Sequence, residues 1–230
     1  MCGSVRSKVV EMLPSAILFD CDGVLADSEP VVNRVVAADL SARGWPLTPD
    51  EAGAMFLGLA FPAMVPLVEA QVGPLPADWT QTLKHRTAET MALEVTPVPG
   101  AAELLATVRA AGVPIALASN SSRVELTAKL TRLGFTEAFA GRIFSFEDVP
   151  RPKPEPDIYL VAAAACGADP ADCVVIEDSA AGVQAGVAAG CTVFGFAQVT
   201  EPEVLLAAGA RTVFTELSRL PKLLGLRVGS

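Results

Sequence analysis

The chain has 230 residues, of which 51% are hydrophobic and 19% charged, and its formal net charge is −9. This composition excludes a disordered tail protein and a miniature disulfide scaffold, and the acidic balance excludes nucleic acid and an anionic bilayer as partners. The mean hydropathy is high, at +0.44. Gly58, Pro62 and Pro66 nevertheless interrupt the apolar stretch 57–68, so no membrane span fits. The surplus of apolar residues instead favours a parallel sheet whose two faces are covered by helices.

The five cysteines are odd in number, contain no CxxC pair and lie mostly in apolar runs. Cysteines in such runs behave as small hydrophobic residues, which favours a reducing compartment. Residues 1–14 lack the continuous apolar segment of a secretory signal. We therefore expect a cytoplasmic monomer whose partner is a small molecule.

Short apolar runs that end in polar residues recur along the chain, beginning with AILF and the DCDG that follows it at 20–23. The later runs lie at 113–122, 143–148, 173–182 and 191–196, with a weaker sixth at 211–214. Helical patterns lie between several of them, for example at 123–133, where three leucines form one stripe and Gly134 ends it. This alternation predicts an α/β fold, a doubly wound parallel sheet with right-handed crossovers.

Residues 28–97 interrupt this alternation, because they hold no convincing buried strand and their apolar residues recur at helical spacing. The apolar positions of this pattern are Val32, Val35, Val36, Leu40, Leu83, Met91 and Leu93. The block is too long for a loop. We expect a helical insertion at 28–97 and a sheet domain made of 1–27 and 98–230.

The single histidine, His85, restricts the possible chemistry. A multi-histidine zinc site cannot be built, and the sequence contains no GxSxG, GxxxxGK[ST] or GxGxxG motif. Asp20 and Asp22 lie two residues apart at a predicted strand end, so both side chains leave one face where open α/β sheets bind ligands. A calcium loop is excluded, because Leu25 stands where that loop needs glycine.

Polar residues also follow three other predicted strands. Ser119 and Asn120 offer a hydroxyl and backbone N–H groups ahead of a helix, which suits an anion such as phosphate. Lys153 lies between two prolines that stiffen its backbone. Glu177 and Asp178 follow a buried run, where adjacent acids are costly unless a cation meets them. Each junction alone also fits an ordinary cap or a solvated turn, but together they predict one site.

The carboxylates suit a hard cation such as Mg²⁺, and the lysine and serine suit a phosphate group. A cation is needed, because a carboxylate approaching a phosphate dianion meets a repulsion of about 4 kcal/mol per charge pair at about 4 Å and an effective dielectric near 20. Asp20 would attack phosphorus to give an aspartyl-phosphate. Asp22 would protonate the leaving oxygen and later activate water.

These residues resemble the motifs of the haloacid dehalogenase superfamily, in its phosphatase and phosphomutase branch. DCDGVLADS at 20–28 is similar to the first motif, Ser119 matches the second, Lys153 the third and Glu177 with Asp178 the fourth. The motifs follow one another in the family's order, and the resemblance covers nearly the whole chain. It implies a Rossmannoid core domain with the insertion as a helical cap.

The same resemblance implies that Mg²⁺ contacts Asp20, the backbone carbonyl of Asp22 and Asp178, with Glu177 either touching the metal or one layer behind it. It also implies that the substrate is a small phosphorylated sugar, polyol or sugar acid. These are expectations drawn from the family rather than from the spacing of the residues.

Three functions remain open within this resemblance. An acid at Asp22 favours ester chemistry over the dehalogenase and phosphonate-cleaving branches. A sugar phosphomutase of the β-phosphoglucomutase type has a histidine where this chain has Val32, and a basic residue where it has Phe61 if Gly58 is the cap glycine. We therefore favour a phosphatase over a mutase. A non-enzymatic module that binds phospho-ligands is the third possibility, but it predicts a lost carboxylate and none is lost.

The residues that select the substrate are expected in the cap. Lys84, His85 and Arg86 lie about 100° apart around a predicted helix, so not all of them can face the substrate. Arg86 is the candidate, by resemblance to a basic residue that points inward in relatives, and a solvated basic face is the alternative. Arg123, which opens the helix after Ser119, is a second candidate for substrate contact.

Overall fold

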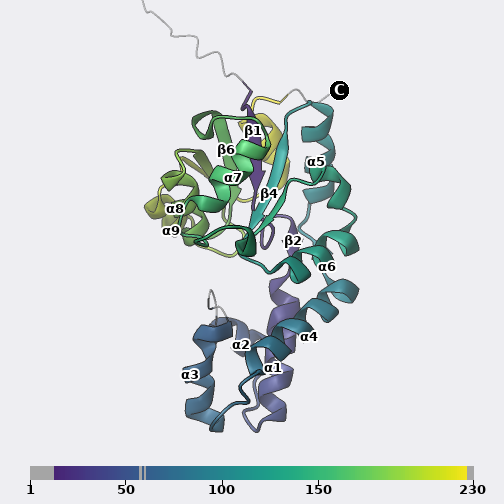
Figure 1. Cartoon of the computed structure of the whole chain (residues 1–230), viewed down its shortest axis with the longest axis vertical. Coiled ribbons are helices and arrows are strands. Elements are labelled where there is room, and N and C mark those ends of the chain that lie inside the picture. The colour runs from purple at the N-terminus through teal and green to yellow at the C-terminus, as the bar shows by residue number, and fades with distance from the viewer. Residues whose placement is uncertain (1–12, 57–58, 60, 227–230) are drawn as a thin grey trace, which may run out of the picture.

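A six-stranded sheet forms the middle of the upper part of the molecule in the computed structural model, which describes residues 13–56, 59 and 61–226 (Figure 1). The strands are β1 (Ala16–Phe19), β4 (Ile115–Ser119), β5 (Ile143–Ser145), β6 (Cys173–Glu177), β7 (Thr192–Phe196) and β8 (Thr212–Phe214). Their order in the sheet is β5-β4-β1-β6-β7-β8, and every neighbouring pair is parallel. The predicted α/β fold with a doubly wound parallel sheet is therefore confirmed.

Helices cover both faces of this sheet (Figure 1). They are α5 (Ala101–Ala110), α6 (Arg123–Leu133), α7 (Asp157–Ala165), α8 (Ala180–Ala188), α9 (Pro202–Ala208) and α10 (Leu220–Leu223), with 3₁₀ turns η1 (Thr136–Phe139), η2 (Phe146–Asp148), η3 (Pro170–Asp172) and η4 (Leu217–Arg219). Side chains alternate along β1. Ile17 and Phe19 pack in one cluster with α5, α6 and α10, while Ala16 and Leu18 pack in another with α7, α8 and α9. The central strand is thus buried on both faces.

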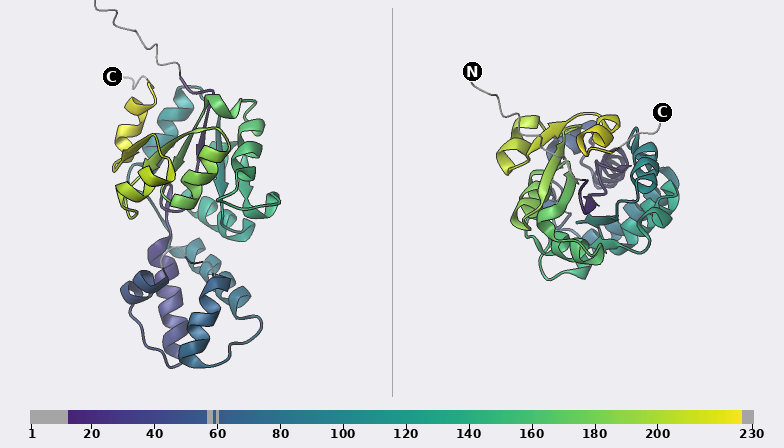
Figure 2. Two further views of the ribbon diagram at one scale, coloured as in Figure 1. Left: turned by 90° about the vertical axis from the view of Figure 1, so that its left-hand side faces the viewer. Right: turned by 90° about the horizontal axis from the view of Figure 1, so that it is seen from above.

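Four helices form a separate block beyond the carboxyl ends of the strands (Figures 1 and 2). They are α1 (Glu29–Ala42), α2 (Pro49–Phe56), α3 (Phe61–Val72) and α4 (Trp79–Glu94). Their own apolar cluster contains Leu40, Phe56, Trp79 and Leu83 among others. The chain enters and leaves the block through an antiparallel two-stranded ribbon, β2 (Ala26–Asp27) with β3 (Thr96–Pro97), which the sequence pattern did not predict.

The apolar pattern of the block is wrong in detail at its carboxyl end. Leu93 is 73% exposed, although its spacing placed it on the buried stripe. Met91 and Val95 pack into the cluster of the sheet domain rather than into that of the block. The reason is that α4 runs from one cluster to the other and ends beside α6, so its buried face changes partner along its length.

Two sequence expectations fall on residues outside this description, namely the reading of the N-terminal segment before Leu13 and the use of Gly58 as a reference glycine. Within the described residues, no single helix has the length and apolar character needed to cross a membrane. Helices α2 and α3 meet these criteria of length and apolar character only when they are counted as one segment, and the two are bent by 114° relative to each other.

The contact of α8 with the sheet depends on Gly186. A Cβ atom at this position would lie 2.7 Å from Cγ2 of Val193 and 3.3 Å from Cγ1 of Val175, both on buried strands. We expect Gly186→Ala to lower the free energy of unfolding by about 1–3 kcal/mol through overpacking. Urea unfolding measures this change.

Exposed Gln184 on the same helix provides the control. The Gln184→Ala variant should be more stable than the Gln184→Gly variant by up to about 1 kcal/mol, the ordinary difference in helix propensity between alanine and glycine. If Gly186→Ala stabilises the protein to the same extent, the packing argument for this helix is wrong.

Candidate active site

Three of the predicted site residues lie at adjacent strand ends. Asp20 directly follows β1, Ser119 is the last residue of β4, and Glu177 is the last residue of β6. β1 lies between the other two strands, with Phe19 in register with Leu117 and Ile176. Parallel strands deliver their carboxyl ends to one edge of the sheet. The structure therefore brings these three buried side chains to one place.

Lys153 reaches the same place from the loop before α7. Its Nζ donates to Asp20 Oδ1 at 2.6 Å, to Glu177 Oε1 at 2.6 Å and to the carbonyl oxygen of Ala118 at 2.8 Å. Three acceptors match the three protons of an ammonium group. Burial alone would lower the pKa of Lys153, but the Asp20 and Glu177 carboxylates raise it well above its usual value. Lys153 is therefore a fixed positive charge against the predicted nucleophile.

Protein donors hold both oxygens of Glu177. Oε1 accepts from Lys153 and from the hydroxyl of Tyr159 at 2.8 Å, and Oε2 accepts from the backbone N–H groups of Asp178 and Ser179 and from the Ser179 hydroxyl at 3.0–3.1 Å. A Cβ on Gly182 would lie 1.7 Å from Oε1, so this turn of α8 leaves room for the carboxylate only because residue 182 is glycine. Glu177 is thus held in place by the protein and in turn fixes the position of the Lys153 ammonium group.

One oxygen from each of Asp20, Glu177 and Asp178 lies within 4.8 Å of the others, a group that could hold a metal ion. Burial, together with the Glu177 and Asp22 charges and against the effect of Lys153, raises the pKa of Asp20 to about 7. Burial and the charges of Glu177 and Asp20 raise the pKa of Asp178 well above its usual value. A bound cation would relieve both effects, and carboxylate oxygens are the ligands that Mg²⁺ prefers.

Gly23 allows these acids to approach one another. Its φ is +72°, and a Cβ there would lie 1.9 Å from Oδ2 of Asp178. Any other residue would therefore both strain the turn after Asp22 and push Asp178 away. The DCDG sequence thus serves the group of carboxylates through its glycine as well as its acids.

Asp22 points to a different set of partners from Asp20. Its Oδ1 accepts from the Ser28 hydroxyl, its Oδ2 accepts from the Ser121 hydroxyl at 2.7 Å, and Nζ of Lys129 lies 2.6 Å from both oxygens. Burial alone would raise the pKa of Asp22, but the Lys129 ammonium and these hydrogen bonds bring it below its usual value. Two carboxylates two residues apart therefore lie in opposite electrostatic environments.

The side chain of Asn120 supports the lysine rather than an anion. Its Nδ2 donates to the carbonyl oxygen of Lys153 at 3.1 Å, and its Oδ1 accepts from the backbone N–H of Lys153 at 3.0 Å. The Ser119 hydroxyl lies 3.4 Å from Asp22 Oδ2, within the group of predicted residues. Both polar atoms of the Asn120 side chain therefore face the loop that carries Lys153. Phosphate binding at Ser119 and Asn120 stays a prediction.

The two arginines predicted to contact substrate are both paired elsewhere. Nη1 of Arg86 donates at 2.7 Å to Asp39 of α1, whose carboxylate also accepts from Arg43 and from the indole of Trp79. Arg123 forms an ion pair with Asp148 of η2. Each guanidinium therefore has a carboxylate partner outside the group around Asp20. The contact of these two residues with substrate stays a prediction.

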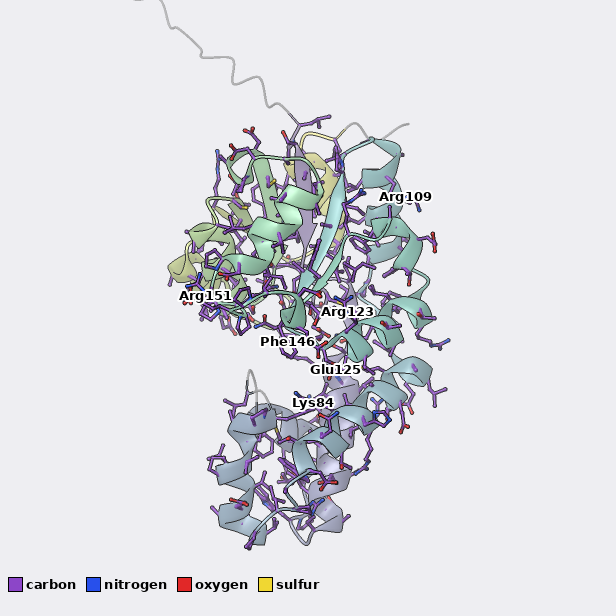
Figure 3. All side chains as sticks on the ribbon, in the orientation of Figure 1. Lys84, Arg109, Arg123, Glu125, Phe146 and Arg151 are labelled. Carbon is purple, nitrogen blue, oxygen red and sulfur yellow. The ribbon has the colours of Figure 1, made fainter. Side chains whose placement is uncertain are left out.

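Lys84 and His85 of the basic triplet both line the gap to the sheet domain, and Lys84 faces Phe146. Figure 3 shows Lys84 on the side of α4 that points toward Phe146 and Glu125, and its Nζ lies 6.0 Å from the centre of the Phe146 ring. A hollow of about 100 Å³ between the block and the sheet domain is lined by Lys84, Ser122, Glu147 and neighbouring residues. The phase of α4 thus turns Lys84 toward the sheet domain and Arg86 toward α1.

Four residues that contact this site were not predicted from the sequence, namely Lys129, Ser28, Ser121 and Tyr159. A signal was present for Lys129, which lies three residues after Leu126 and next to Leu130 on the stripe that defined the helix. The predicted helix 123–133 is confirmed at both ends, with a capping box at Ser122 and Glu125 and a left-handed Gly134. A lysine on the buried stripe of such a helix indicates a buried ion pair. The serines and the tyrosine offered no comparable pattern.

Comparison with known proteins places this geometry among enzymes. The family model for haloacid dehalogenase-like hydrolases matches residues 14–190. The chain is 30% identical to the 6-phosphogluconate phosphatase of Escherichia coli K12 over 90% of this chain and 93% of that one. It is 39% identical to hexitol phosphatase A of the same organism, over 76% and 80% of the two chains. A crystal structure of a HAD family hydrolase from Deinococcus radiodurans R1, with bound phosphate and sodium, superposes with a TM-score of 0.79 at 38% identity over 94% and 98% of the chains.

The raised pKa of Asp20 predicts how cation binding depends on pH. Between the unfolded value of 3.8 and the folded value of about 7, the folded protein binds more protons than the unfolded chain, so this group lowers stability as pH rises. We expect Mg²⁺ to raise the melting temperature more at pH 8 than at pH 5.5, where protons compete with it. A cation present at 100 times its dissociation constant adds about 2.7 kcal/mol to the free energy of unfolding.

Thermal unfolding with and without Mg²⁺ at both pH values measures this effect. Asp178→Asn should weaken the response, and Glu103→Gln, at an exposed position on α5, should leave it unchanged. An equal response at both pH values, or a full response in Asp178→Asn, would show that this group does not hold the cation.

Proposed function

Because the chain belongs to the haloacid dehalogenase-like hydrolases and is a phosphoric monoester hydrolase, we propose that it hydrolyses a small phosphorylated sugar, polyol or sugar acid through an aspartyl-phosphate, with Mg²⁺ as cofactor. One observation carries this proposal. Asp20 lies at the end of the central strand between the Lys153 ammonium and two further carboxylates. A nucleophile, a charge for the phosphate and ligands for a cation therefore meet at one carboxylate.

Asp20 is the proposed nucleophile. Lys153 fixes its orientation through Oδ1, and the hydrogen bonds of Asn120 and Glu177 fix Lys153 in turn. The carboxylate of Asp20 attacks phosphorus, and a new oxygen–phosphorus bond forms as the bond to the leaving oxygen breaks. The hydroxyl of Ser119 and the ammonium of Lys153 would bind the oxygens of the phosphoryl group. Preorganised charges of this kind need no rearrangement during the reaction.

Mg²⁺ when bound would shield the negative charges of the phosphoryl group and of the acids around it. Asp20, Asp178 and the backbone carbonyl of Asp22 would hold it. Glu177 would mainly position its neighbours rather than bind the metal directly, since both of its oxygens already accept hydrogen bonds from protein donors. The raised pKa values of Asp20 and Asp178 support a site in which cationic charge is needed.

Asp22 is the proposed general acid and base. Lys129 favours the carboxylate form of Asp22 in the substrate-free protein, so Asp22 must take up a proton before the first step. In that step the proton passes to the oxygen of the leaving alcohol as the phosphorus–oxygen bond breaks. In the second step its carboxylate accepts a proton from water, which attacks phosphorus and releases phosphate while the bond to Asp20 breaks. The carboxylate is partly exposed, so it can meet both the leaving oxygen and water.

The block 28–97 is the proposed cap over a core of 1–27 and 98–230. It lies beyond the carboxyl ends of the strands (Figure 2), which is the edge of the sheet where Asp20 follows β1. The names of the relatives, a 6-phosphogluconate phosphatase and a hexitol phosphatase, support a sugar acid or polyol as the alcohol part of the substrate. Lys84 is positioned to contact that part from the cap.

The simplest test is the release of p-nitrophenol from p-nitrophenyl phosphate. We expect turnover with Mg²⁺ and none with EDTA. Asp20→Asn should lower kcat by roughly 10³-fold or more, because the reaction loses its nucleophile. Glu103→Gln, at an exposed position on α5, should retain full activity, and circular dichroism should show that all the proteins are folded.

Metal-independent turnover, or an Asp20→Asn variant as fast as the parent, would contradict the proposed mechanism. Binding of phosphorylated ligands without any turnover would instead indicate a binding module. Glucose 1-phosphate isomerisation primed by a sugar bisphosphate, faster than phosphate release, would indicate a mutase. We expect phosphate release to dominate, because Val32 packs among apolar side chains and Phe61 carries no charge for a second phosphate.

A panel of phosphorylated metabolites tests the role of Lys84. We expect Lys84→Met to raise KM by about 10-fold for a sugar-acid phosphate such as 6-phosphogluconate, and less for a hexitol phosphate, because only the acid offers a second negative group. kcat should change little, since Lys84 is not among the residues that contact Asp20. Steady-state kinetics on both substrates measures the difference.

Arg86→Met is the matched contrast. It removes a partner of Asp39, so it should lower the melting temperature and leave KM unchanged. If Arg86→Met raises KM while Lys84→Met does not, Arg86 rather than Lys84 contacts the substrate.

A further inference from the structure

Lys129 is a buried charge that the mechanism above does not use. Its side chain is 1% exposed, and it lies on the face of α6 that carries Leu126 and Leu130 into the core. Burying an ammonium group costs several kcal/mol unless carboxylates and hydrogen bonds compensate it. A leucine or methionine would fill such a position without that cost. The lysine therefore calls for a reason beyond packing.

The contacts of Lys129 all converge on one carboxylate. Its Nζ lies 2.6 Å from Oδ1 and 2.6 Å from Oδ2 of Asp22, and it donates to the Ser121 hydroxyl at 2.7 Å. That hydroxyl in turn donates to Oδ2 of Asp22 at 2.7 Å. Ser28 binds Oδ1 from the chain segment that leads into α1. Contact with both oxygens fixes the direction of the side chain and the plane of the carboxylate together.

We propose that Lys129 is the positioning residue of the general acid, holding the Asp22 carboxylate on the α6 side of the site and apart from the group formed by Asp20, Glu177 and Asp178. This inference rests on the proposed function, because it assumes that Asp22 exchanges protons with the leaving oxygen. Lys129 touches neither the nucleophile nor the predicted phosphate ligands. It acts only through Asp22.

The chemistry of the leaving group separates positioning from a general structural role. When the phosphorus–oxygen bond of an alkyl phosphate breaks, the alkoxide must receive the proton of Asp22 as the bond to Asp20 forms. The p-nitrophenolate anion is stable enough to leave without that proton. A misplaced Asp22 therefore slows the alkyl ester much more than the aryl ester, whereas a damaged fold slows both equally.

The experiment compares Lys129→Met with the parent protein in the presence of Mg²⁺, using β-glycerophosphate and p-nitrophenyl phosphate. We expect kcat/KM to fall by about 10²-fold for β-glycerophosphate, in the range of a lost general acid, and by less than about 5-fold for p-nitrophenyl phosphate. Lys222→Met, at an exposed position on α10, is the control and should behave as the parent. Equal losses on the two substrates, or no loss on either, would overturn the proposal.

The double variant Asp22→Asn/Lys129→Met closes the cycle. Because Lys129 acts only through Asp22, the double variant should match Asp22→Asn alone on both substrates. It also removes both charges of the buried pair, so it remains informative if Lys129→Met alone does not fold. A further loss of more than about 5-fold beyond Asp22→Asn would show that Lys129 acts elsewhere and would overturn the proposal.

The same data distinguish this inference from the proposed function. A parent protein without turnover, or an Asp22→Asn variant that hydrolyses β-glycerophosphate at the parent rate, would contradict the proposed function itself. A normal effect of Asp22→Asn together with equal losses in Lys129→Met would contradict only the role of Lys129.

Discussion

The gathering of four carboxylates at one edge of the sheet is the constraint on which the site depends. Asp20, Asp22, Glu177 and Asp178 lie at or just after the ends of the neighbouring strands β1 and β6, and Asp20, Glu177 and Asp178 form one close group. Two like charges about 4 Å apart repel by on the order of 4 kcal/mol at an effective dielectric of about 20. Two buried lysines compensate part of this charge. The two negative charges left over equal the charge of one divalent cation. Burial is the first cause of the raised pKa values of Asp20 and Asp178, and the neighbouring carboxylates add to it.

The two lysines divide these acids into sets with different chemistry. Lys153 holds Asp20 and Glu177 deep in the site, and Lys129 holds Asp22 toward α6. This separation suits the proposed roles of the two aspartates as nucleophile and as proton carrier. Without two separate cations, residues so close in sequence would have nearly the same environment and could not be assigned different tasks.

The segment after Asp22 joins this electrostatic arrangement to the helical block. Ser28 hydrogen-bonds Asp22 and immediately precedes α1, and the β2–β3 ribbon brings the chain back beside the place where it left. At its far end α4 packs with the sheet domain through Met91, while Lys84 faces Phe146 across the gap. The block is thus attached directly beside Asp22.

The sequence by itself determined the alternation of strands and helices, the insertion of a helical block and the order of the acidic, serine and lysine motifs. Periodicity and strand-end polarity are local properties, so they survive without knowledge of the fold. Only the tertiary structure decided the partners: Asn120 on the backbone of Lys153, Lys84 rather than Arg86 toward the sheet, and Lys129 on Asp22. The periodicity of a helix tells which of its sides is buried. It does not tell which residue lies against that side, because the partner of Lys129, Asp22, is about a hundred residues away in the chain.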